Sequence, residues 1–448
     1  MIDYHLYDTR GIERGVLNLM KFEFLHPADQ LVLMMDRIYR GRLTTTSGGN
    51  LSVLDENGDI WITPSGVDKG SLSRDDICRV TPEGQIFGPH RPSVEWPFHA
   101  TIYKRRPDLR AVIHAHPPAL VAFAAARVLP DTRLVADIHR ILGPLTVVPY
   151  AMPGSQELGG LVSEAFGRGF DVALMENHGA AVGASDIFVA FMKLETFQRS
   201  ASMELRARKL GAPRPLSERE LGLVSRDEHL IEDAFLPGTR SSEEYEVRRE
   251  MVKMIHRACR QKLFSSTLGT CSVRLDDGSF VITAQGLDLA YAEEADLVRV
   301  KDGQRERGKV PSPSAALHGK IYEKHPNMRS ICEASSPNAM AFALTDSHFC
   351  PRTVPEGYAM LRQVLRAPFS ALYLEQDKIV DMLSDWTPVM ICENSHILAC
   401  GDRLLTAFDR IEVMEATAES IVLAQEIGPL VHISDEDVEA INRAFLSG

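Results

Sequence analysis

The sequence predicts an α/β sandwich that occurs twice in tandem, each copy with helices on both faces of a central sheet. The 448 residues are too many for one ordinary core, which favours two domains of about 200 residues each. The second half of the chain repeats the first. Within each copy, apolar residues switch between helical and strand spacing, which indicates helices and strands in mixed order.

The internal repeat defines the predicted domains. Three pairs of segments align, the first two at a shift of 220 residues and the third at 219: 37–53 with 257–273, 58–66 with 278–286, and 106–124 with 325–343. Between the copies lies a segment rich in Pro, Ser and charged residues, which is typical of a linker. The predicted bounds are therefore a first domain at 1–215, a linker at 216–240 and a second domain at 241–448.

The expected elements follow in the same order in each copy: helix, hairpin, helix, buried strand, helix, strand and closing helix. In the first copy, ADQLVLMMDRIYRG has helical spacing after Asp29, and Asn57-Gly58 marks a hairpin turn. SVEWPFHATIYKRRPD is expected to be helical, and AVIHAH and DVALMEN to be buried strands. A long amphipathic helix is expected to begin at Ser185 or Asp186 and to stop at Gly211.

Composition excludes several classes of partner. The formal net charge is −12 and the longest basic run is Lys104-Arg105-Arg106, so no nucleic acid is expected to bind. No apolar stretch approaches the roughly 18 to 20 residues of a membrane span, and the N-terminus lacks the plan of a signal peptide. We therefore expect no membrane partner and a cytoplasmic location. Seven cysteines without a CxxC motif suit free thiols.

Three histidines and one carboxylate carry the candidate chemistry. His114 and His116, at i and i+2 of a predicted strand, share a face about 7 Å apart along the backbone, so both imidazoles can chelate one ion. His178 ends the next strand and precedes Gly179, where the backbone can turn closely around a site. Three histidines with an open fourth position describe a catalytic zinc centre. Glu95, flanked by apolar side chains, is the candidate base.

Simpler interpretations exist for each residue. The histidines could be hydrogen-bonded core residues, and Glu95 could form a structural ion pair. The segments SGGN and TPSG are turns when taken alone. The joint occurrence of all these features favours the metal site.

The motifs together resemble a known family. SGGN, TPSG, PSVEWPFH, HAHPP and NHG stand in the order and spacing of the class II aldolase and adducin family, as in its L-fuculose-phosphate aldolase-like members. The resemblance covers about residues 20–211 with all motifs and about 240–430 as fold only. It implies two tandem class II aldolase-like domains, each with a mostly antiparallel central sheet, the second copy being degenerate.

The resemblance also implies roles for single residues. Zn²⁺ would be bound by His114, His116 and His178, although three imidazoles also accept other divalent metals. Glu95 would be the catalytic acid/base. The positions that would hold a substrate phosphate are Asn50, Ser65, Gly66 and Ser93.

Two positions bear on the substrate and on a neighbouring subunit. Val94 stands where the family commonly has a second hydroxyl side chain, which weakens the expectation of a phosphorylated substrate. Family members borrow an acid from an adjacent subunit, and in the equivalent loop VADIHRILG that residue would be Asp137 or His139.

The predicted function is a metal-dependent lyase that makes or breaks a C–C bond of a sugar-like or hydroxy-ketone substrate through an enediolate, with zinc as the Lewis acid. An epimerase, a decarboxylase or a dehydratase could use the same enediolate. A non-enzymatic, adducin-like scaffold is the alternative from another class. Because the first copy keeps every ligand, the sequence favours an enzyme acting on a small molecule.

The second copy is expected to be non-catalytic. Glu333 and Ser335 replace the two histidines of the strand, Ser314 replaces Glu95, and Ser395 replaces His178. A separate metal site built from Glu333, His318 and His396 is a weaker alternative. The duplication predicts a homodimer whose four domains form a pseudo-tetramer, with one metal ion per chain.

Overall fold

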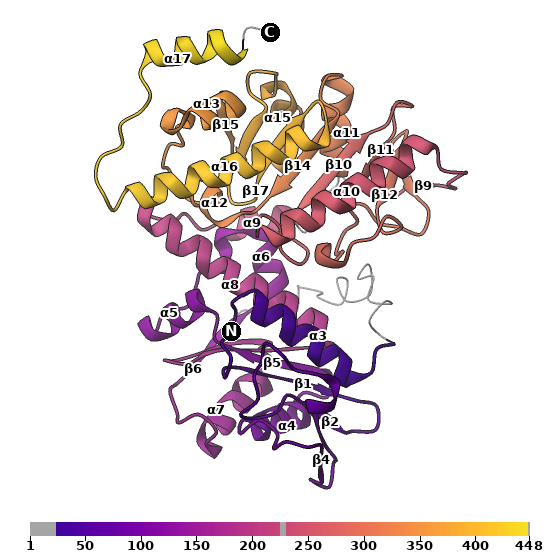
Figure 1. The fold of residues 1–448 in the computed structure, drawn as a ribbon, viewed down its shortest axis with the longest axis vertical. Helices are drawn as coiled ribbons and strands as arrows, with labels where there is room; N and C mark the ends of the chain where they lie inside the picture. Colours follow the sequence, from indigo (N-terminus) through magenta and orange to yellow (C-terminus); the bar gives the residue numbers. More distant parts are fainter. Residues whose placement is uncertain (1–23, 225–229, 447–448) are drawn as a thin grey trace. The chain divides into compact units, whose positions relative to one another are not determined.

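The computed structural model describes residues 24–224 and 230–446, which form two compact units. The first unit contains the described residues up to 132 together with 137–202, and the second contains 133–136 and the described residues from 203 onward. Each unit holds one sheet with helices against it (Figure 1). The tandem α/β architecture is thereby confirmed, whereas the domain bounds 1–215, 216–240 and 241–448 stay a prediction.

The elements up to the end of the long helix are as follows: α3 (Pro27–Arg40), β1 (Asn50–Leu54), β2 (Ile60–Ile62), β3 (Cys78–Val80), β4 (Ile86–Phe87), α4 (Trp96–Arg105), β5 (Ala111–Ala115), α5 (Pro118–Ala126), α6 (Ala136–Leu142), β6 (Leu145–Val148), α7 (Gln156–Gly167), β7 (Val172–Met175), β8 (Gly179–Ala184) and α8 (Ile187–Leu210).

The remaining elements, which belong to the second unit, are as follows: α9 (Glu218–Val224), β9 (Ala234–Phe235), α10 (Ser242–Arg260), β10 (Thr270–Arg274), β11 (Phe280–Ile282), β12 (Val298–Lys301), β13 (Gln304–Glu306), α11 (Ala315–Lys324), β14 (Ser330–Ala334), α12 (Pro337–Ala343), α13 (Pro355–Leu361), β15 (Val364–Ala367), α14 (Ala371–Leu374), α15 (Gln376–Met382), β16 (Val389–Cys392), β17 (His396–Gly401), α16 (Leu404–Ala424) and α17 (Asp435–Ile441).

The two sheets share one topology. The first has the order β4-β3-β2-β1-β5-β8-β7-β6. In the same direction, the equivalent strands of the second are β13-β12-β11-β10-β14-β17-β16-β15, and β9 is added beside β13. All neighbours are antiparallel except β6 with β7, β15 with β16, and β9 with β13. The register repeats as well, since Asn50 pairs with His114 and Thr270 with Glu333. The mostly antiparallel sheet and the internal repeat are therefore confirmed.

The core of the first unit lies between its sheet and two helices. Strand residues alternate between faces, and one face of the sheet packs against α4 and α7 (Figure 1). Phe98 and Ile102 from α4 meet Phe166 from α7 in this cluster, all of them buried. The opposite face of β1 and β2 contacts α3. Burial of such aromatic and aliphatic side chains is the main stabilising contribution, of about 1.5–3 kcal/mol per side chain.

Several boundaries differ from those expected. The first helix starts at Pro27 with His26 as its N-cap, so Asp29 lies inside the first turn. Asp186, rather than Ser185, caps the long helix, because its Oδ1 accepts from the N–H groups of residues 188 and 189. The segment expected as a linker contains α9 and β9, and β9 pairs with β13 of the second sheet.

Two further predictions concern the thiols and membranes. None of the seven cysteines, all of which lie in the described part of the chain, forms a disulfide. Among the described residues, no helix combines the length and apolar character that a membrane span requires.

Candidate metal centre

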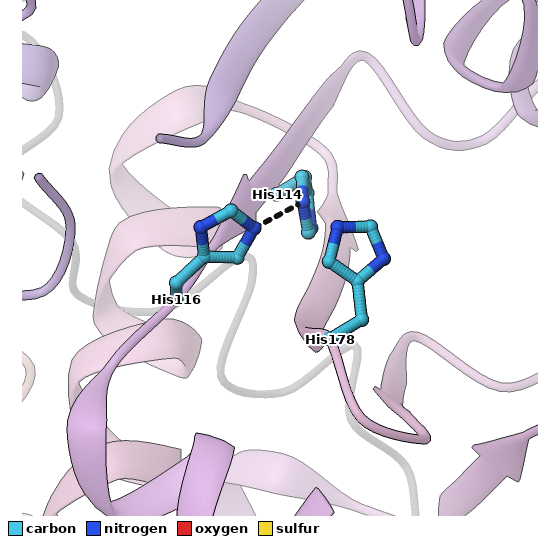
Figure 2. Close-up of side chains that lie close together, drawn as sticks. All are labelled: His114, His116 and His178. Atoms are coloured by element: carbon cyan, nitrogen blue, oxygen red, sulfur yellow. Dashed lines mark hydrogen bonds between the residues drawn. The ribbon is translucent and has the colours of Figure 1, made fainter. Parts of the chain in front are cut away.

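Three histidines converge where strand β5 ends beside the turn between β7 and β8. His114 lies in β5, His116 follows its last residue, and His178 lies in the turn. Their ring centroids are 4.7, 4.7 and 5.1 Å apart, and one nitrogen from each lies within 4.8 Å of the others. Figure 2 shows the three rings grouped around one space. Within residues 24–224 and 230–446, this is the one group of three potential ligands with such geometry.

The protonation of these histidines suits ligation. Nδ1 of His114 donates to the carbonyl oxygen of Ala180 at 2.9 Å, since a carbonyl only accepts. In the neutral ring its Nε2 therefore carries a free lone pair, and this nitrogen lies 2.9 Å from Nε2 of His116. Burial lowers the pKa of His114 well below its ordinary value, and the neighbouring histidines lower it further. Burial also lowers the pKa of His116 and of His178, so the three rings are neutral near pH 7, the state in which imidazole binds metals.

Glu95 faces the same space from the start of α4, where it is the N-cap rather than a residue within the helix. Its Oε2 lies 3.4 Å from Nε2 of His114, and its Oε1 lies 3.7 Å from Nε2 of His178. The side chain is 8% exposed. Sequence reasoning placed Glu95 near the histidines, and the structure brings all four together.

The donor set fits a divalent cation. Buried polar atoms are hydrogen-bonded in native proteins with few exceptions, yet Oε1 of Glu95 and Nδ1 of His178 have no hydrogen-bond partner. One of these unpartnered atoms, the carboxylate oxygen, lies 3.7 Å from Nε2 of His178. Three neutral imidazoles with an adjacent carboxylate are a donor set that zinc and similar first-row metals accept.

A buried chain of hydrogen bonds holds Glu95 from behind. Nδ2 of Asn50 donates to Oε2 of Glu95 at 2.7 Å, and Nε2 of His99 donates to Oδ1 of Asn50 at 2.5 Å. The hydroxyl of Ser52 bonds to Nδ1 of His99 at 2.7 Å and to the hydroxyl of Tyr103 at 2.6 Å. Burial lowers the pKa of His99 to about 3, so the ring is neutral. Its two hydrogen bonds fix the orientation of the Asn50 side chain and, through it, of the Glu95 carboxylate.

The residues expected to hold a phosphate lie on segments that backbone hydrogen bonds join. Ser65 donates its N–H to the carbonyl of Arg91 at 2.9 Å, and Ser93 donates its N–H to that of Thr63 at 3.2 Å. Gly66 follows Ser65 with φ of 71°. Asn50 is different, because its side chain is engaged with Glu95 and His99. In this structure Asn50 positions the carboxylate, and a contact of Asn50 with substrate stays a prediction.

The expected loop with an acid for a neighbouring subunit is a helix. Asp137 and His139 lie in α6. The Asp137 carboxylate accepts from Arg140 at 2.9 Å, and Nδ1 of His139 bonds to the hydroxyl of Thr132 at 2.8 Å. The catalytic role of Asp137 stays a prediction.

The second unit lacks the histidine group but keeps a buried carboxylate. Glu333 occupies the strand position of His114, and its Oε1 lies 3.0 Å from Nε2 of His318 and 3.4 Å from that of His396. Ser314, at the position of Glu95, donates to Oε2 of Glu333 at 2.6 Å. Glu333, His318 and His396 are thus neighbours, but they do not form a group with metal-ligand geometry among the described residues.

Sequence reasoning missed the chain behind Glu95. Ser52 and Tyr103 received no role. A signal was present, because the second copy repeats Ser272, His318 and Tyr322 at the same positions, with matching hydrogen bonds of 2.7 and 2.5 Å.

Comparison with known sequences and structures identifies several similar proteins. The family description "Class II Aldolase and Adducin N-terminal domain" matches residues 29–205 and again 249–422. A 3-oxo-tetronate 4-phosphate decarboxylase of Haemophilus influenzae is 30% identical over 182 residues, which are 39% of this chain and 85% of that protein. An L-fuculose phosphate aldolase of Methanococcus maripaludis is 31% identical over 169 residues, 37% of this chain and 89% of that protein. A solved L-fuculose 1-phosphate aldolase is 31% identical with a TM-score of 0.41, covering 45% of this chain and 94% of its own.

Proposed function

This chain belongs to the class II aldolase and adducin family, and on that premise we propose that its first unit is a metal-dependent lyase, while its second unit is non-catalytic. The proposed reaction makes or breaks a C–C bond of a sugar-like or hydroxy-ketone substrate. One observation carries the proposal: three neutral histidines and a buried carboxylate with an unpartnered oxygen surround one space.

The histidines would hold the cation, with His114 fixed by its bond to the Ala180 carbonyl. Zinc is the proposed metal. When bound, it would supply a Lewis acid that neutralises negative charge developing on substrate oxygens. Burial of His114 and the packed layer of α4 and α7 behind it keep water away from one side of the site.

Glu95 would move the proton. Its Oε2 is held by Asn50, whereas its Oε1 is free of hydrogen bonds and is therefore the oxygen that can accept or return a proton. The chain through His99 and Ser52 fixes the carboxylate, so that little reorganisation is needed when the proton moves.

A second reaction class has specific support. The relatives named above include both an L-fuculose phosphate aldolase and a 3-oxo-tetronate 4-phosphate decarboxylase. Retro-aldol cleavage beside an α-hydroxy ketone and loss of CO₂ from a 2-hydroxy-3-oxo acid both leave an enediolate, so the same four residues could serve either reaction. The proposed substrate is phosphorylated, as the names of these relatives suggest, and Ser65, Gly66 and Ser93 are the proposed phosphate positions.

The proposed assembly is a homodimer of four domains. Asp137 is proposed to act in the site of a partner subunit, as the acid of the leaving group. Gel filtration with light scattering tests the assembly, and a monomer with full activity would contradict it.

The test of the function is elemental analysis of the purified chain followed by a cleavage assay. We expect one zinc ion per chain, and turnover of a phosphorylated ketose or 3-oxo acid in a coupled assay. His116→Ser, which copies Ser335 of the second unit, should lose the metal and reduce turnover at least about a thousandfold without unfolding the chain.

A matched control uses the second unit. Ser335→Ala should leave metal content and turnover unchanged. Two metal ions per chain, or a His116→Ser chain that unfolds, would contradict the proposal.

A further inference from the structure

Lys69 is a buried lysine beneath the turn formed by TPSG. Its side chain is almost fully enclosed, at 3% exposure. Its ammonium donates to the carbonyl oxygen of Pro64, the residue before Ser65 and Gly66. Its backbone N–H donates to the carbonyl of Thr46 at 3.0 Å, which ties this segment to the one that ends in SGGN.

Within the part of the chain that the structure describes, Lys69 has no acidic counterion. Among the described residues no carboxylate forms an ion pair with it, and the ionisable group that interacts with it is the thiol of Cys78. Burial raises the pKa of that thiol, so Cys78 is uncharged near pH 7. An ammonium taken out of water with one carbonyl acceptor carries a desolvation penalty, which is also why burial lowers the pKa of Lys69.

The second unit shows that folding does not require an amine at this position. Leu289 is the equivalent residue, since its N–H donates to the carbonyl of Ser266 at 2.7 Å as that of Lys69 does to Thr46. Leu289 is 1% exposed. The same backbone therefore accepts an apolar side chain in the unit that has lost the histidines, whereas the unit that keeps them buries a charge.

The TPSG turn is exposed at Gly66. A Cβ added at Gly66 would meet no heavy atom within 4 Å, and this residue has a positive φ. Lys69 is thus buried against the carbonyl of Pro64, while the turn is open at Gly66, the residue after Ser65.

We propose that Lys69 is a specificity-determining residue, which holds the TPSG turn and gives it a positive potential that selects a substrate bearing a phosphate group. This inference rests on the proposed function and names its substrate class. Lys69 acts through the turn and is therefore a positioning residue. Its positive charge compensates for the hydrogen bond to phosphate that Val94, which lacks a hydroxyl, does not supply.

The experiment measures binding of inorganic phosphate to the purified full chain by isothermal titration. The variants are Lys69→Leu, which copies the second unit, Lys69→Met and Lys69→Arg, with Lys104→Leu as a control that removes an exposed lysine of α4. We expect saturable binding to the unmodified chain, a loss of about tenfold or more with Leu and Met, and a loss of less than about threefold with Arg and with the control. Metal content should not change in any of them.

A kinetic measurement separates charge from structure. For a phosphorylated substrate, Lys69→Leu should raise KM about tenfold while kcat changes less than about threefold. Equal phosphate binding by the unmodified chain and by Lys69→Leu, or no phosphate binding by the unmodified chain, would overturn the inference. Unfolding of both the Leu and Met variants would assign the amine a structural role and would also overturn it. Since the titration requires no turnover, a failure of the proposed lyase reaction would be recognised separately.

Discussion

Both units contain the same buried chain of hydrogen bonds, but it ends on carboxylates from different places. In the first unit it runs through His99 and Asn50 to Glu95, before α4. In the second it runs through His318 directly to Glu333, in β14. The carboxylate therefore comes from a different position in each unit, whereas the Ser, His and Tyr residues behind it are the same.

The difference separates structure from chemistry within one chain. The Ser, His and Tyr residues of the chain persist in the unit without a metal centre, so their first role is to satisfy buried polar groups. By contrast, the residues proposed to act on a substrate, Glu95, His114, His116 and His178, all differ between the units, as does Lys69. The second unit therefore supplies residues for comparison in the substitutions below.

The largest effect is expected when Glu95 is replaced by the residue of the second unit. Glu95→Ser should reduce kcat by about a hundred- to ten-thousandfold, because a positioned general acid/base contributes that much. Metal content, measured by elemental analysis, should stay near that of the unmodified chain. Ser314→Ala serves as the control with unchanged turnover. A Glu95→Ser chain within tenfold of the original rate would assign the proton transfer to another residue.

The next largest effect is on the free energy of unfolding, at a position where the second unit has a buried arginine and the first unit has an alanine. Arg248 of α10 is fully buried and contacts Glu244 at 2.7 Å and Glu306 at 3.0 Å, whereas the first unit has Ala28 at this position. Arg248→Ala should lower the free energy of unfolding by about 3–5 kcal/mol, because it removes the buried guanidinium that joins the two carboxylates and donates to the carbonyl of Leu297. Arg299 remains beside Glu244 and Lys309 beside Glu306. Urea unfolding of the full chain measures it.

The control for this prediction is the exposed neighbour Arg249, whose ion pair with Glu246 is solvated. Arg249→Ala should have a much smaller effect than Arg248→Ala. If the two variants were destabilised equally, the buried cluster would not be what stabilises α10 against the sheet.

A third prediction uses the buried carboxylate of the second unit. Burial alone would raise the pKa of Glu333, but His396, His318 and the hydroxyl of Ser314 outweigh it and lower the pKa to about 2 from its ordinary value of 4.5. A depressed folded-state pKa contributes stability that is present above about pH 4.5 and is lost as the pH falls towards 2. The contribution is on the order of 3 kcal/mol.

The measurement is the urea midpoint between pH 6 and pH 2.5, compared with that of Glu333→Gln. The Gln side chain cannot ionise, so its variant should be less stable at pH 6 and should approach the unmodified chain at the lowest pH. Parallel pH profiles for the two chains would contradict the assignment of this stability to Glu333.

The sequence predicted the repeat and the three histidines, because each rests on local pattern: apolar spacing, an Asn57-Gly58 turn and motifs of few residues. Its order of elements was incomplete, since it lacked β6, α7 and β8. It did not predict that the carboxylate of Glu95 depends on Asn50, since 45 residues separate them and only strand pairing brings them together. Lys69 was missed for the same reason, because its burial depends on two turns from different parts of the chain. The helical form of α6 was missed because a short segment gives a weak periodic signal.

The smallest effect is expected at Val94, where neither copy has a hydroxyl: the second unit has Pro313 at the equivalent position. Val94 is 64% exposed, so a change there should alter the free energy of unfolding by less than about 0.5 kcal/mol. Val94→Ser adds the donor that the family commonly has, and one new hydrogen bond of about 1 kcal/mol should lower KM for a phosphorylated substrate about fivefold. Val94→Ala removes the same methyl groups without adding a hydroxyl. If both variants had the same KM, the side chain at this position would not reach the phosphate, and the turn above Lys69 would be left as the anion-binding element.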